Sequence, residues 1–315
     1  MKPKVVVIVG PTASGKTALS VKLAKKIDGE IISSDSMQVY KDMNIGTAKV
    51  TEEEKEGIEH YLVDFVSPCE RYTVSDFKND AEVAINKIIE KNKMPIIVGG
   101  TGLYVNSIIY NIKYTDMEFD EDYRNMLMDI AKTEEGLENL YKKAIEIDEK
   151  AAKAISKNDK KRIVRILEIY KATGKTKTAL EEESRKIDSP YEFYLFGINI
   201  DREKLYEKIN KRVDLMMQKG LVEEVKMLLD KYDSFPTAMQ GLGYKEVKEY
   251  LDGKISYDDM VEKIKQESRR YAKRQMTWFR RNDGIIWLDG NNSIDENVDI
   301  IIKNIGWGFE KKKYF

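Results

Sequence analysis

The sequence predicts an α/β fold in which a doubly wound parallel sheet carries a P-loop and is interrupted by a helical insertion domain. Three observations lead to this prediction. The first hundred residues alternate short apolar runs with helical periodicity, which is typical of βα units. Residues 10–17 join the first apolar run to the first helix with the spacing of a phosphate-binding loop. Residues 114–189 show helical patterns and no strong strand signal.

Four strands are predicted in the first hundred residues. The run at residues 5–9 is continuous and β-branched, as expected for a parallel strand buried on both faces. The other runs are residues 30–33, 61–66 and 95–98. Apolar residues at helical spacing predict a helix over residues 77–89 and an earlier helix whose apolar face holds Leu19, Leu23, Ala24 and Ile27.

The second half of the chain is mainly helical. We expect helices over residues 123–131, 136–147, 150–155 and 160–173, then a strand over residues 193–200. A long helical pattern begins at Arg202, with Leu205, Ile209, Val213 and Met216 on its apolar face. We therefore assign residues 1–112 and 193–315 to the α/β core with its C-terminal helices, and residues 113–192 to the helical insertion.

Composition excludes several classes of protein. The 315 residues carry 54 basic and 55 acidic side chains, a formal net charge of −1, so neither a polyanion nor a uniformly basic protein fits. A single cysteine, Cys69, excludes an internal disulfide and a zinc site of cysteines, and a single histidine, His60, excludes a multi-histidine metal centre. The sequence has no run of 18 apolar residues. We expect a cytoplasmic protein without a membrane segment.

The strongest motif fits G-x-x-x-x-G-K-[ST] and consists of Gly10, Pro11, Thr12, Ala13, Ser14, Gly15, Lys16 and Thr17. Glycines let the backbone approach a phosphate closely, and the N–H groups at the start of the following helix favour an anion. Lys16 adds a positive charge for the terminal phosphates, and the Thr17 hydroxyl is a candidate ligand of Mg²⁺. The motif predicts a site for a di- or triphosphate but does not specify the reaction.

Acidic residues at strand ends are candidates for proton transfer or metal binding. Asp35 follows the strand at residues 30–33, where ligands of open α/β sheets gather, so it is a candidate general base or metal ligand, or else a turn residue. The strand at residues 95–98 ends in two glycines, where a P-loop nucleotidase normally has an aspartate. Asp64 is a candidate substitute or a turn acid. Gln38 is a candidate contact to a base edge or a surface amide.

Two basic tracts suggest a surface for a polyanion. Residues 160–186 carry 9 bases against 4 acids, and residues 263–281 carry 8 bases against Glu267 alone. Five of the 12 arginines fall within residues 269–281, interleaved with Tyr271, Trp278 and Phe279. Arginine makes bidentate contacts to phosphate, which favours a polyanion surface over a solvated helix face.

The chain resembles the bacterial tRNA dimethylallyltransferases, also called tRNA isopentenyltransferases or the IPP transferase family, over residues 4 to about 290. The segments that carry the resemblance occur in order: GPTASGKT, SSDSMQVYKDMNIGTAK, a strand ending in GGTGLY, NDKKRIVRILE, GKTKT, INKRVDLMMQKGLVEEV, QGLGYKEVKEYLDGKISYDDMV and AKRQMTWFRR. The resemblance implies transfer of a dimethylallyl group from dimethylallyl diphosphate to N6 of the adenosine just 3′ of the anticodon, with Mg²⁺ and release of diphosphate.

The resemblance also implies roles for individual residues. Asp35 would be the general base, while Thr101 and Arg212 would hold the diphosphate and its bridging oxygen. The P-loop would bind the diphosphate of the prenyl donor rather than a nucleotide. The anticodon stem-loop of tRNA would contact Asp35, Ser36, Met37, Gln38, Thr101, Arg124, Lys161, Arg162, Arg165, Lys273, Arg274, Trp278 and Arg280. At Met37 and Gln240 the sequence departs from the family, since many relatives have arginine there. A monomer is expected.

Three other functions remain open from the residues alone. A P-loop small-molecule kinase would transfer a phosphoryl group, but the absent strand-end aspartate and the basic helical half weigh against it. An adenylate isopentenyltransferase would use the same donor with a free nucleotide, which leaves the basic second half without a purpose. A non-catalytic RNA-binding switch would use the P-loop as a sensor, and Asp35 beside that loop argues against it.

Overall fold

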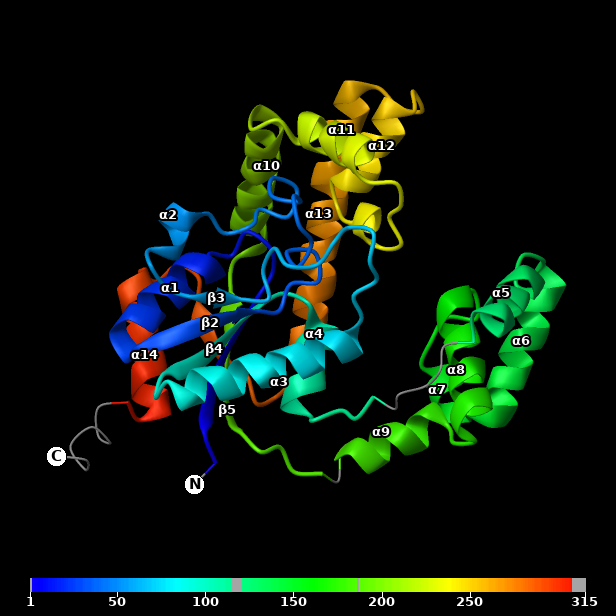
Figure 1. Cartoon of the computed structure of the whole chain (residues 1–315), viewed down its shortest axis with the longest axis horizontal. Coiled ribbons are helices and arrows are strands. Elements are labelled where there is room, and N and C mark those ends of the chain that lie inside the picture. The colour runs from blue at the N-terminus through cyan, green and yellow to red at the C-terminus, as the bar shows by residue number, and fades with distance from the viewer. Residues whose placement is uncertain (1, 115–119, 186, 308–315) are drawn as a thin grey trace. The chain divides into compact units, whose positions relative to one another are not determined.

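A computed structural model describes residues 2–114, 120–185 and 187–307 of the chain (Figure 1). The chain forms two compact units. The first contains Met1–Ile108 and Pro190–Phe315, and the second contains Ile109–Ser189. The boundaries expected from the sequence were residues 112/113 and 192/193.

The first unit is built on a parallel sheet, as the sequence predicts. In the described part of the chain the sheet has six strands in the order β3-β2-β4-β1-β5-β6, and every neighbouring pair is parallel. The strands are β1 (Lys4–Val9), β2 (Gly29–Ser33), β3 (His60–Tyr61), β4 (Met94–Gly99), β5 (Glu192–Asn199) and β6 (Ile286–Asp289). The predicted α/β class with a doubly wound sheet is confirmed.

Helices cover both faces of the sheet (Figure 1). Helices α1 (Lys16–Ile27) and α14 (Ile294–Ile305) pack together on one face, where their apolar side chains form a core with Val6, Ile8, Ile31, Ile96 and Phe196. Helix α3 (Val74–Glu90) packs against β2 and β4. The central strands β1 and β4 are apolar from Val5 to Val9 and from Met94 to Gly99, as suits strands that are buried on both faces.

The remaining elements of the first unit extend the fold beyond the sheet. They are α2 (Glu52–Lys55), α4 (Gly102–Ile109), α10 (Arg202–Gln218), α11 (Leu221–Lys231), η1 (Ala238–Gln240), α12 (Tyr244–Leu251) and α13 (Tyr257–Phe279). Helix α10 packs along α13, and a second core joins α10, α11, α12 and α13 to the segment that follows β2 through Val39, Tyr40 and Met43. Helices α10 to α13 therefore hold the loop that follows β2 in place, at the carboxyl end of that strand.

One predicted strand is wrong in extent, and one strand lay outside the prediction. The strand expected over residues 61–66 is reduced to His60–Tyr61. Leu62 and Asp64 both have φ of 60°, a left-handed conformation that no β-strand can contain. Val66 forms an isolated parallel bridge to Tyr40, outside the six-stranded sheet. The short edge strand β6 was not predicted, since four residues carry too little periodicity.

The second unit consists of helices, as expected. They are α5 (Glu121–Ile130), α6 (Glu134–Ile147), α7 (Glu149–Lys153), α8 (Lys160–Thr173) and α9 (Lys177–Arg185), the last of which was not predicted. Their apolar faces form a separate core that includes Leu127, Leu140, Ile163 and Leu167. The Asp148 carboxylate accepts hydrogen bonds from the Ala151 and Thr178 N–H groups and from the Thr178 hydroxyl, so it ties α7 to α9.

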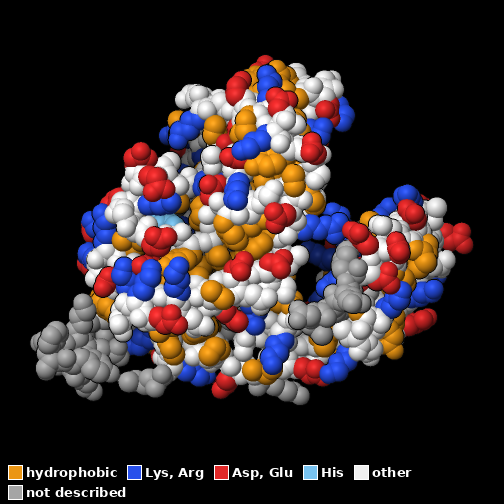
Figure 2. All heavy atoms as spheres, viewed as in Figure 1, with side chains coloured by type: hydrophobic (Ala, Val, Ile, Leu, Met, Phe, Trp, Pro, Cys, Tyr) orange, Lys and Arg blue, Asp and Glu red, His pale blue; other side chains and the backbone are white. Residues whose placement is uncertain are grey.

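The surface agrees with the near-zero net charge. Acidic and basic side chains are interspersed over the face of the molecule in Figure 2. Among the described residues, none of the helices is long and apolar enough to cross a bilayer.

A buried carboxylate stabilises the edge of the sheet opposite the P-loop. Glu30, which is 3% exposed, accepts hydrogen bonds from Lys91, Lys93 and Tyr61 at 2.7–3.2 Å. Burial opposes ionisation of Glu30, but these hydrogen bonds outweigh it and lower the pKa of the carboxyl to about 2. A carboxyl whose folded pKa is depressed stabilises the protein above its unfolded pKa and loses this contribution as pH falls.

We predict that Glu30→Gln lowers the free energy of unfolding by about 1–3 kcal/mol near neutral pH, because charge-assisted hydrogen bonds are lost. The difference between wild type and variant should persist down to the unfolded pKa of about 4.5 and shrink as pH falls towards 2. Urea unfolding at several pH values measures both quantities. A difference that does not change with pH would contradict the assigned pKa.

Candidate active site

Three strand ends converge at the carboxyl edge of the sheet. Strand β1 runs into the P-loop, β2 into Asp35, and β4 into Thr101. The register pairs Val9 with Gly99, and Ser33 with Val98, so these ends lie side by side. The Ser36 N–H donates to the Thr101 hydroxyl at 3.1 Å, and this bond joins the loops that follow β2 and β4. The parallel topology thus brings together groups that are up to 91 residues apart in the sequence.

The P-loop has the geometry of an anion site. Ala13 and Gly15 have φ of 61° and 88°, which turns the backbone into the first turn of α1. The Lys16 ammonium folds back and donates to the Gly10 and Pro11 carbonyl oxygens at 3.0 and 2.6 Å. The Ser14 hydroxyl is buried and has no hydrogen-bond partner among the described residues. An unsatisfied buried hydroxyl beside a helix N-terminus fits a phosphate ligand.

Two half-buried cations and one carboxylate dominate the electrostatics of the site. Burial and, to a smaller extent, the charge of Arg212 lower the pKa of Lys16 to about 7, against the opposing effect of Asp35. Burial also lowers the pKa of Arg212, again opposed by Asp35. A single carboxylate does not compensate two desolvated cations. An anionic ligand would supply the missing charge, so the site favours a diphosphate over a neutral ligand.

Two cavities meet at these residues. The first, called here the P-loop cavity, has a volume of about 100 Å³ and is bordered by Lys16, Thr17 and Gln38. The second, called here the outer cavity, has a volume of about 530 Å³ and lies between the loop after β2 and helices α10, α12 and α13. Four residues border both cavities, namely Thr12, Asp35, Arg212 and Tyr271. A group bound in the P-loop cavity would therefore face a group bound in the outer cavity across Asp35.

Asp35 is both a turn residue and a cavity residue. Its Oδ1 atom accepts from the N–H groups of Met37 and Gln38 at 2.9 and 3.4 Å. These bonds orient the carboxylate, as in an Asx turn. Its Oδ2 atom has no hydrogen-bond partner within the described ranges, so it is available to a ligand. Asp35 can therefore be a turn residue, through Oδ1, and a candidate general base, through Oδ2, at the same time.

Helix α13 contributes two side chains that sequence analysis did not assign to the site. The Thr12 N–H of the P-loop donates to Gln275 Oε1 at 2.9 Å, and Gln275 Nε2 donates to the Gly100 carbonyl oxygen at 3.0 Å. Tyr271 lies one turn earlier and borders both cavities, and burial raises its pKa to about 12. The i, i+4 spacing places both side chains on one face of the helix. The i, i+4 spacing of Tyr271 and Gln275 was the sequence signal for this shared face. It was missed because the surrounding residues are mostly charged and indicated a polyanion surface.

Arg212 and Gln38 meet at one carbonyl group. Arg212 Nη2 and Gln38 Nε2 each donate to the Thr47 carbonyl oxygen at 3.3 Å, and Gln38 Nε2 also reaches the Ala48 carbonyl oxygen at 3.3 Å. Thr47 borders the outer cavity, whereas Ala48 borders the P-loop cavity. The loop after β2 thus separates and supports both cavities.

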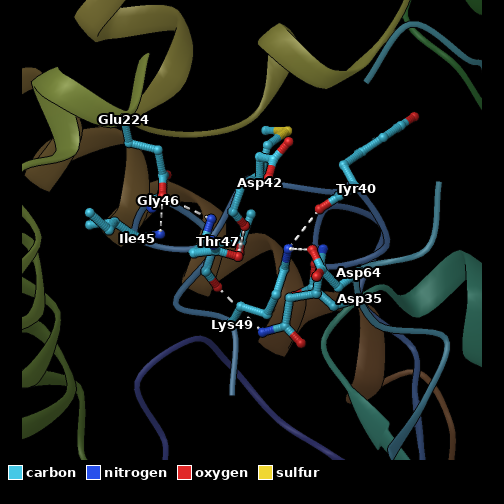
Figure 3. Close-up of polar contacts among 12 residues, drawn as sticks. Asp35, Tyr40, Asp42, Ile45, Gly46, Thr47, Lys49, Asp64 and Glu224 are labelled. Carbon is cyan, nitrogen blue, oxygen red and sulfur yellow. Dashed lines mark hydrogen bonds and ion pairs between the residues drawn. The ribbon is translucent and has the colours of Figure 1, made fainter. Parts of the chain in front are cut away.

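The structure places the other candidates of this region as follows. Asp64 pairs with Lys49 at 2.5 Å, so it acts as a turn acid and the idea of a substitute metal ligand loses support (Figure 3). Met37 and Gln240, the two departures from the family pattern, both border the outer cavity. Met37 packs against Gly241, whose missing Cβ would lie 2.7 Å from the Met37 methyl carbon.

The basic tract on α13 divides into two parts. Lys263, Lys265, Arg269 and Arg270 pair with carboxylates at the start of the tract. The later bases of the tract are Lys273, Arg274, Arg280 and Arg281. Among the described residues, none of these four has a carboxylate partner within 4.0 Å. Trp278 lies among them and packs on Gly102, where a Cβ would be 2.2 Å from the indole ring. Only the second part therefore has charge to offer a polyanion.

The predicted contacts of the second unit lie on α5 and α8. Arg124 holds the Glu168 carboxylate at 2.9–3.0 Å, so its guanidinium already serves the packing of that unit. Arg165 lies 3.7 Å from the same carboxylate, and Arg162 lies 3.3 Å from Asp159. Lys161 is exposed on α8. The roles of these residues towards tRNA stay predictions.

No cluster of three or more His, Cys, Asp or Glu side chains suited to a metal ion occurs in the part of the chain that the structure describes. A divalent cation here would depend on oxygen atoms from a ligand. The Thr17 hydroxyl is exposed at the first turn of α1 and borders the P-loop cavity. This donor set suits Mg²⁺, which keeps waters and binds through phosphate oxygens with one or two protein oxygens.

The profile of one protein family, described as IPP transferase, matches residues 38–282. A protein named tRNA dimethylallyltransferase from Acetivibrio thermocellus is 53% identical over 302 residues, which cover 96% of each chain. The crystal structure of the full-length tRNA isopentenylpyrophosphate transferase from Bacillus halodurans is similar with a TM-score of 0.74 and 43% identity, covering 99% of this chain and 98% of that one.

A eukaryotic dimethylallyltransferase acting on tRNA, known from crystallographic snapshots, is similar with a TM-score of 0.80 and 31% identity. The similarity covers 98% of this chain and 80% of that one. The likeness therefore extends over both units and is not confined to the P-loop.

We predict that binding of inorganic diphosphate takes up a proton above pH 7, because the anion favours the charged form of Lys16, whose pKa in the free protein is about 7. Calorimetry in buffers of different ionisation enthalpy measures this uptake. It should increase between roughly pH 6 and 8 and be absent in Lys16→Met. Proton uptake that is equal in wild type and Lys16→Met would show that another group titrates.

Proposed function

The chain belongs to the IPP transferase family, and from this premise we propose that it is a tRNA dimethylallyltransferase. It transfers the dimethylallyl group of dimethylallyl diphosphate to N6 of the adenosine 3′-adjacent to the anticodon and releases diphosphate. The observation that carries the proposal is the junction of the two cavities at Asp35 and Arg212. The family expected from the ordered motifs is confirmed.

The P-loop cavity suits the diphosphate of the donor. As the allylic C–O bond breaks, negative charge develops on the leaving oxygen, and fixed positive groups stabilise it. Lys16, the N–H groups of the P-loop and Arg212 are such groups, and they are held in place before the ligand arrives. Thr17 is the residue that would hold Mg²⁺ together with diphosphate oxygens, and the ion would neutralise part of the leaving-group charge.

Asp35 suits the role of general base. The exocyclic amine of adenine is a poor nucleophile because its lone pair is delocalised into the ring, and it must lose a proton once it bonds to the allylic carbon. Asp35 borders both cavities, and its Oδ2 atom is available to that proton. His60, the single histidine, borders only the P-loop cavity, so it is poorly placed to serve an amine in the outer cavity.

The outer cavity suits the acceptor base. An adenine in an anticodon loop must leave its stack to react, and a pocket of about 530 Å³ offers space for it. Ser36 borders the outer cavity and Tyr271 borders both cavities, whereas Thr101 borders neither and is joined to Ser36 by a hydrogen bond. The exposed bases of α8 and the later bases of α13 are suited to the phosphates of the stem-loop. We extend the proposal to a monomer that acts alone on one tRNA.

One assay separates this function from the other candidates. Purified protein is mixed with labelled dimethylallyl diphosphate and unmodified tRNA, AMP or no acceptor, without ATP. Label in tRNA supports the proposal, and label in AMP supports an adenylate isopentenyltransferase. No label in either acceptor would favour a kinase or an RNA-binding switch and would overturn the proposal.

We predict that Asp35→Asn slows transfer by about 10²- to 10⁴-fold, because the amide keeps the shape but cannot accept the proton. Affinities for tRNA and donor should change by less than about tenfold. Single-turnover measurements on a preformed ternary complex test this. Asp233→Asn, an exposed aspartate outside both cavities, is the control. Near-normal transfer by Asp35→Asn would rule it out as the base.

We also predict that replacing Arg274 and Arg280 by Ala weakens tRNA binding and lowers the salt dependence, with a slope smaller by about 2, because each lost phosphate contact removes about one unit. Donor affinity should stay unchanged. The double variant Lys265→Ala, Arg270→Ala on the same helix is the control, since both bases already pair with carboxylates. Equal slopes for the two double variants would contradict the proposed division of α13.

A further inference from the structure

A buried carboxylate on α11 holds the loop that lies between the two cavities. Glu224 is 7% exposed. Its Oε2 atom accepts from the N–H groups of Asn44 and Ile45 at 2.9 and 2.7 Å, and its Oε1 atom accepts from the Gly46 N–H at 3.2 Å (Figure 3). Three consecutive N–H groups that point at one anion form a backbone nest. Glu224 thus takes the place that a bound anion would occupy in such a nest.

A tyrosine completes the shell around Glu224. The Tyr244 hydroxyl donates to Glu224 Oε1 at 2.6 Å, and the ring is fully buried. The ring leaves no room for a side chain at Gly46, because a Cβ there would lie 2.4 Å from it. Four donors therefore satisfy the carboxylate, which makes its burial tolerable and determines the conformation of the loop.

The loop transmits this constraint to the reaction centre. Directly after Gly46, the Thr47 carbonyl oxygen accepts from both Arg212 and Gln38. Within the loop, the Thr47 hydroxyl donates to the Met43 carbonyl oxygen at 2.6 Å, which links the two ends of the turn that Glu224 holds. Glu224 itself borders neither cavity. It can influence the reaction only through the groups that the loop holds.

We propose that Glu224 is a positioning residue for prenyl transfer, which orients Arg212 at the junction of the two cavities, and Gln38 beside the P-loop cavity, by holding the Thr47 carbonyl in place. The inference rests on the proposed function, because it assigns Arg212 to the leaving diphosphate. A guanidinium that is displaced by a fraction of an ångström stabilises the developing charge less well, even when the substrates still bind.

Glu224→Gln tests the proposal with little change in shape. The carboxamide puts an NH₂ group where the carboxylate accepts hydrogen bonds, so at least one donor of the nest loses its partner. We expect single-turnover transfer to slow by about tenfold to hundredfold, with tRNA affinity changed less than about threefold. Glu223→Gln, the exposed neighbour on the same helix, is the matched control and should transfer at the wild-type rate.

A double-mutant cycle with Arg212→Ala distinguishes positioning from general loss of structure. Glu224→Gln slows transfer by one factor in the wild type and by another in the Arg212→Ala background. If Glu224 acts through Arg212, the second factor should be clearly smaller than the first. Losses that multiply independently, or a Glu224→Gln rate within threefold of wild type, would overturn the proposal. A wild-type protein that does not prenylate tRNA would instead refute the proposed function, and this control is run in the same assay.

Tyr244→Phe keeps the test decisive if Glu224→Gln does not fold. It removes one donor from the carboxylate and preserves the buried ring. We expect transfer to slow by roughly twofold to fivefold, with coupling to Arg212→Ala in the same direction and unchanged circular dichroism. A folded Tyr244→Phe variant with the wild-type rate, in the absence of a folded Glu224→Gln protein, would overturn the proposal.

Discussion

The site depends on an imbalance of charge at the carboxyl edge of the sheet. Lys16 and Arg212 are both half-buried and lose hydration, and Asp35 is the carboxylate whose charge acts on both of them. The cost of burying these cations appears in the lowered pKa of each, and a bound diphosphate would remove it. In the proposed reaction, the same imbalance would let the P-loop hold a leaving diphosphate without a strand-end aspartate. A site that binds a leaving group must neutralise charge, whereas a nucleotidase must also organise the attack on phosphorus.

Segments far from the P-loop in the sequence keep these cations in place. Helix α13 supplies Gln275, which bonds the P-loop to the loop after β4. Helix α11 supplies Glu224, which holds the loop after β2. Ala13 of the P-loop packs on a small core formed by α10 and α13. The C-terminal helices therefore help to form the candidate site, since they hold the P-loop and the loop that follows Asp35 in place.

The charged residues of these helices serve two separate purposes. Near the start of the α13 tract, Lys263 and Lys265 pair with carboxylates on α12 and α10 and fasten α13 to these helices. Arg269 and Arg270 pair with carboxylates of α13 itself, while the bases at the end of the tract stay available. A count of charges along the sequence does not separate the two groups. The same holds for Arg124, which sequence reasoning assigned to tRNA and which pairs with Glu168. Ion pairing is a property of neighbours in space, so it becomes visible only in the folded chain.

The sequence by itself determined the α/β class, the P-loop, the helical insertion, the family and Asp35 as the acid at a strand end. Each of these follows from local pattern: apolar period, motif spacing, or a residue directly after a strand. Only the tertiary structure decided that β3 ends at Tyr61, because positive φ values at Leu62 and Asp64 leave no trace in apolar periodicity. It also decided that Tyr271 and Gln275 border the site and that Glu224 holds one of its loops. Gln275 and Glu224 bond to backbone groups 175 to 263 residues away, and no local pattern encodes such a contact.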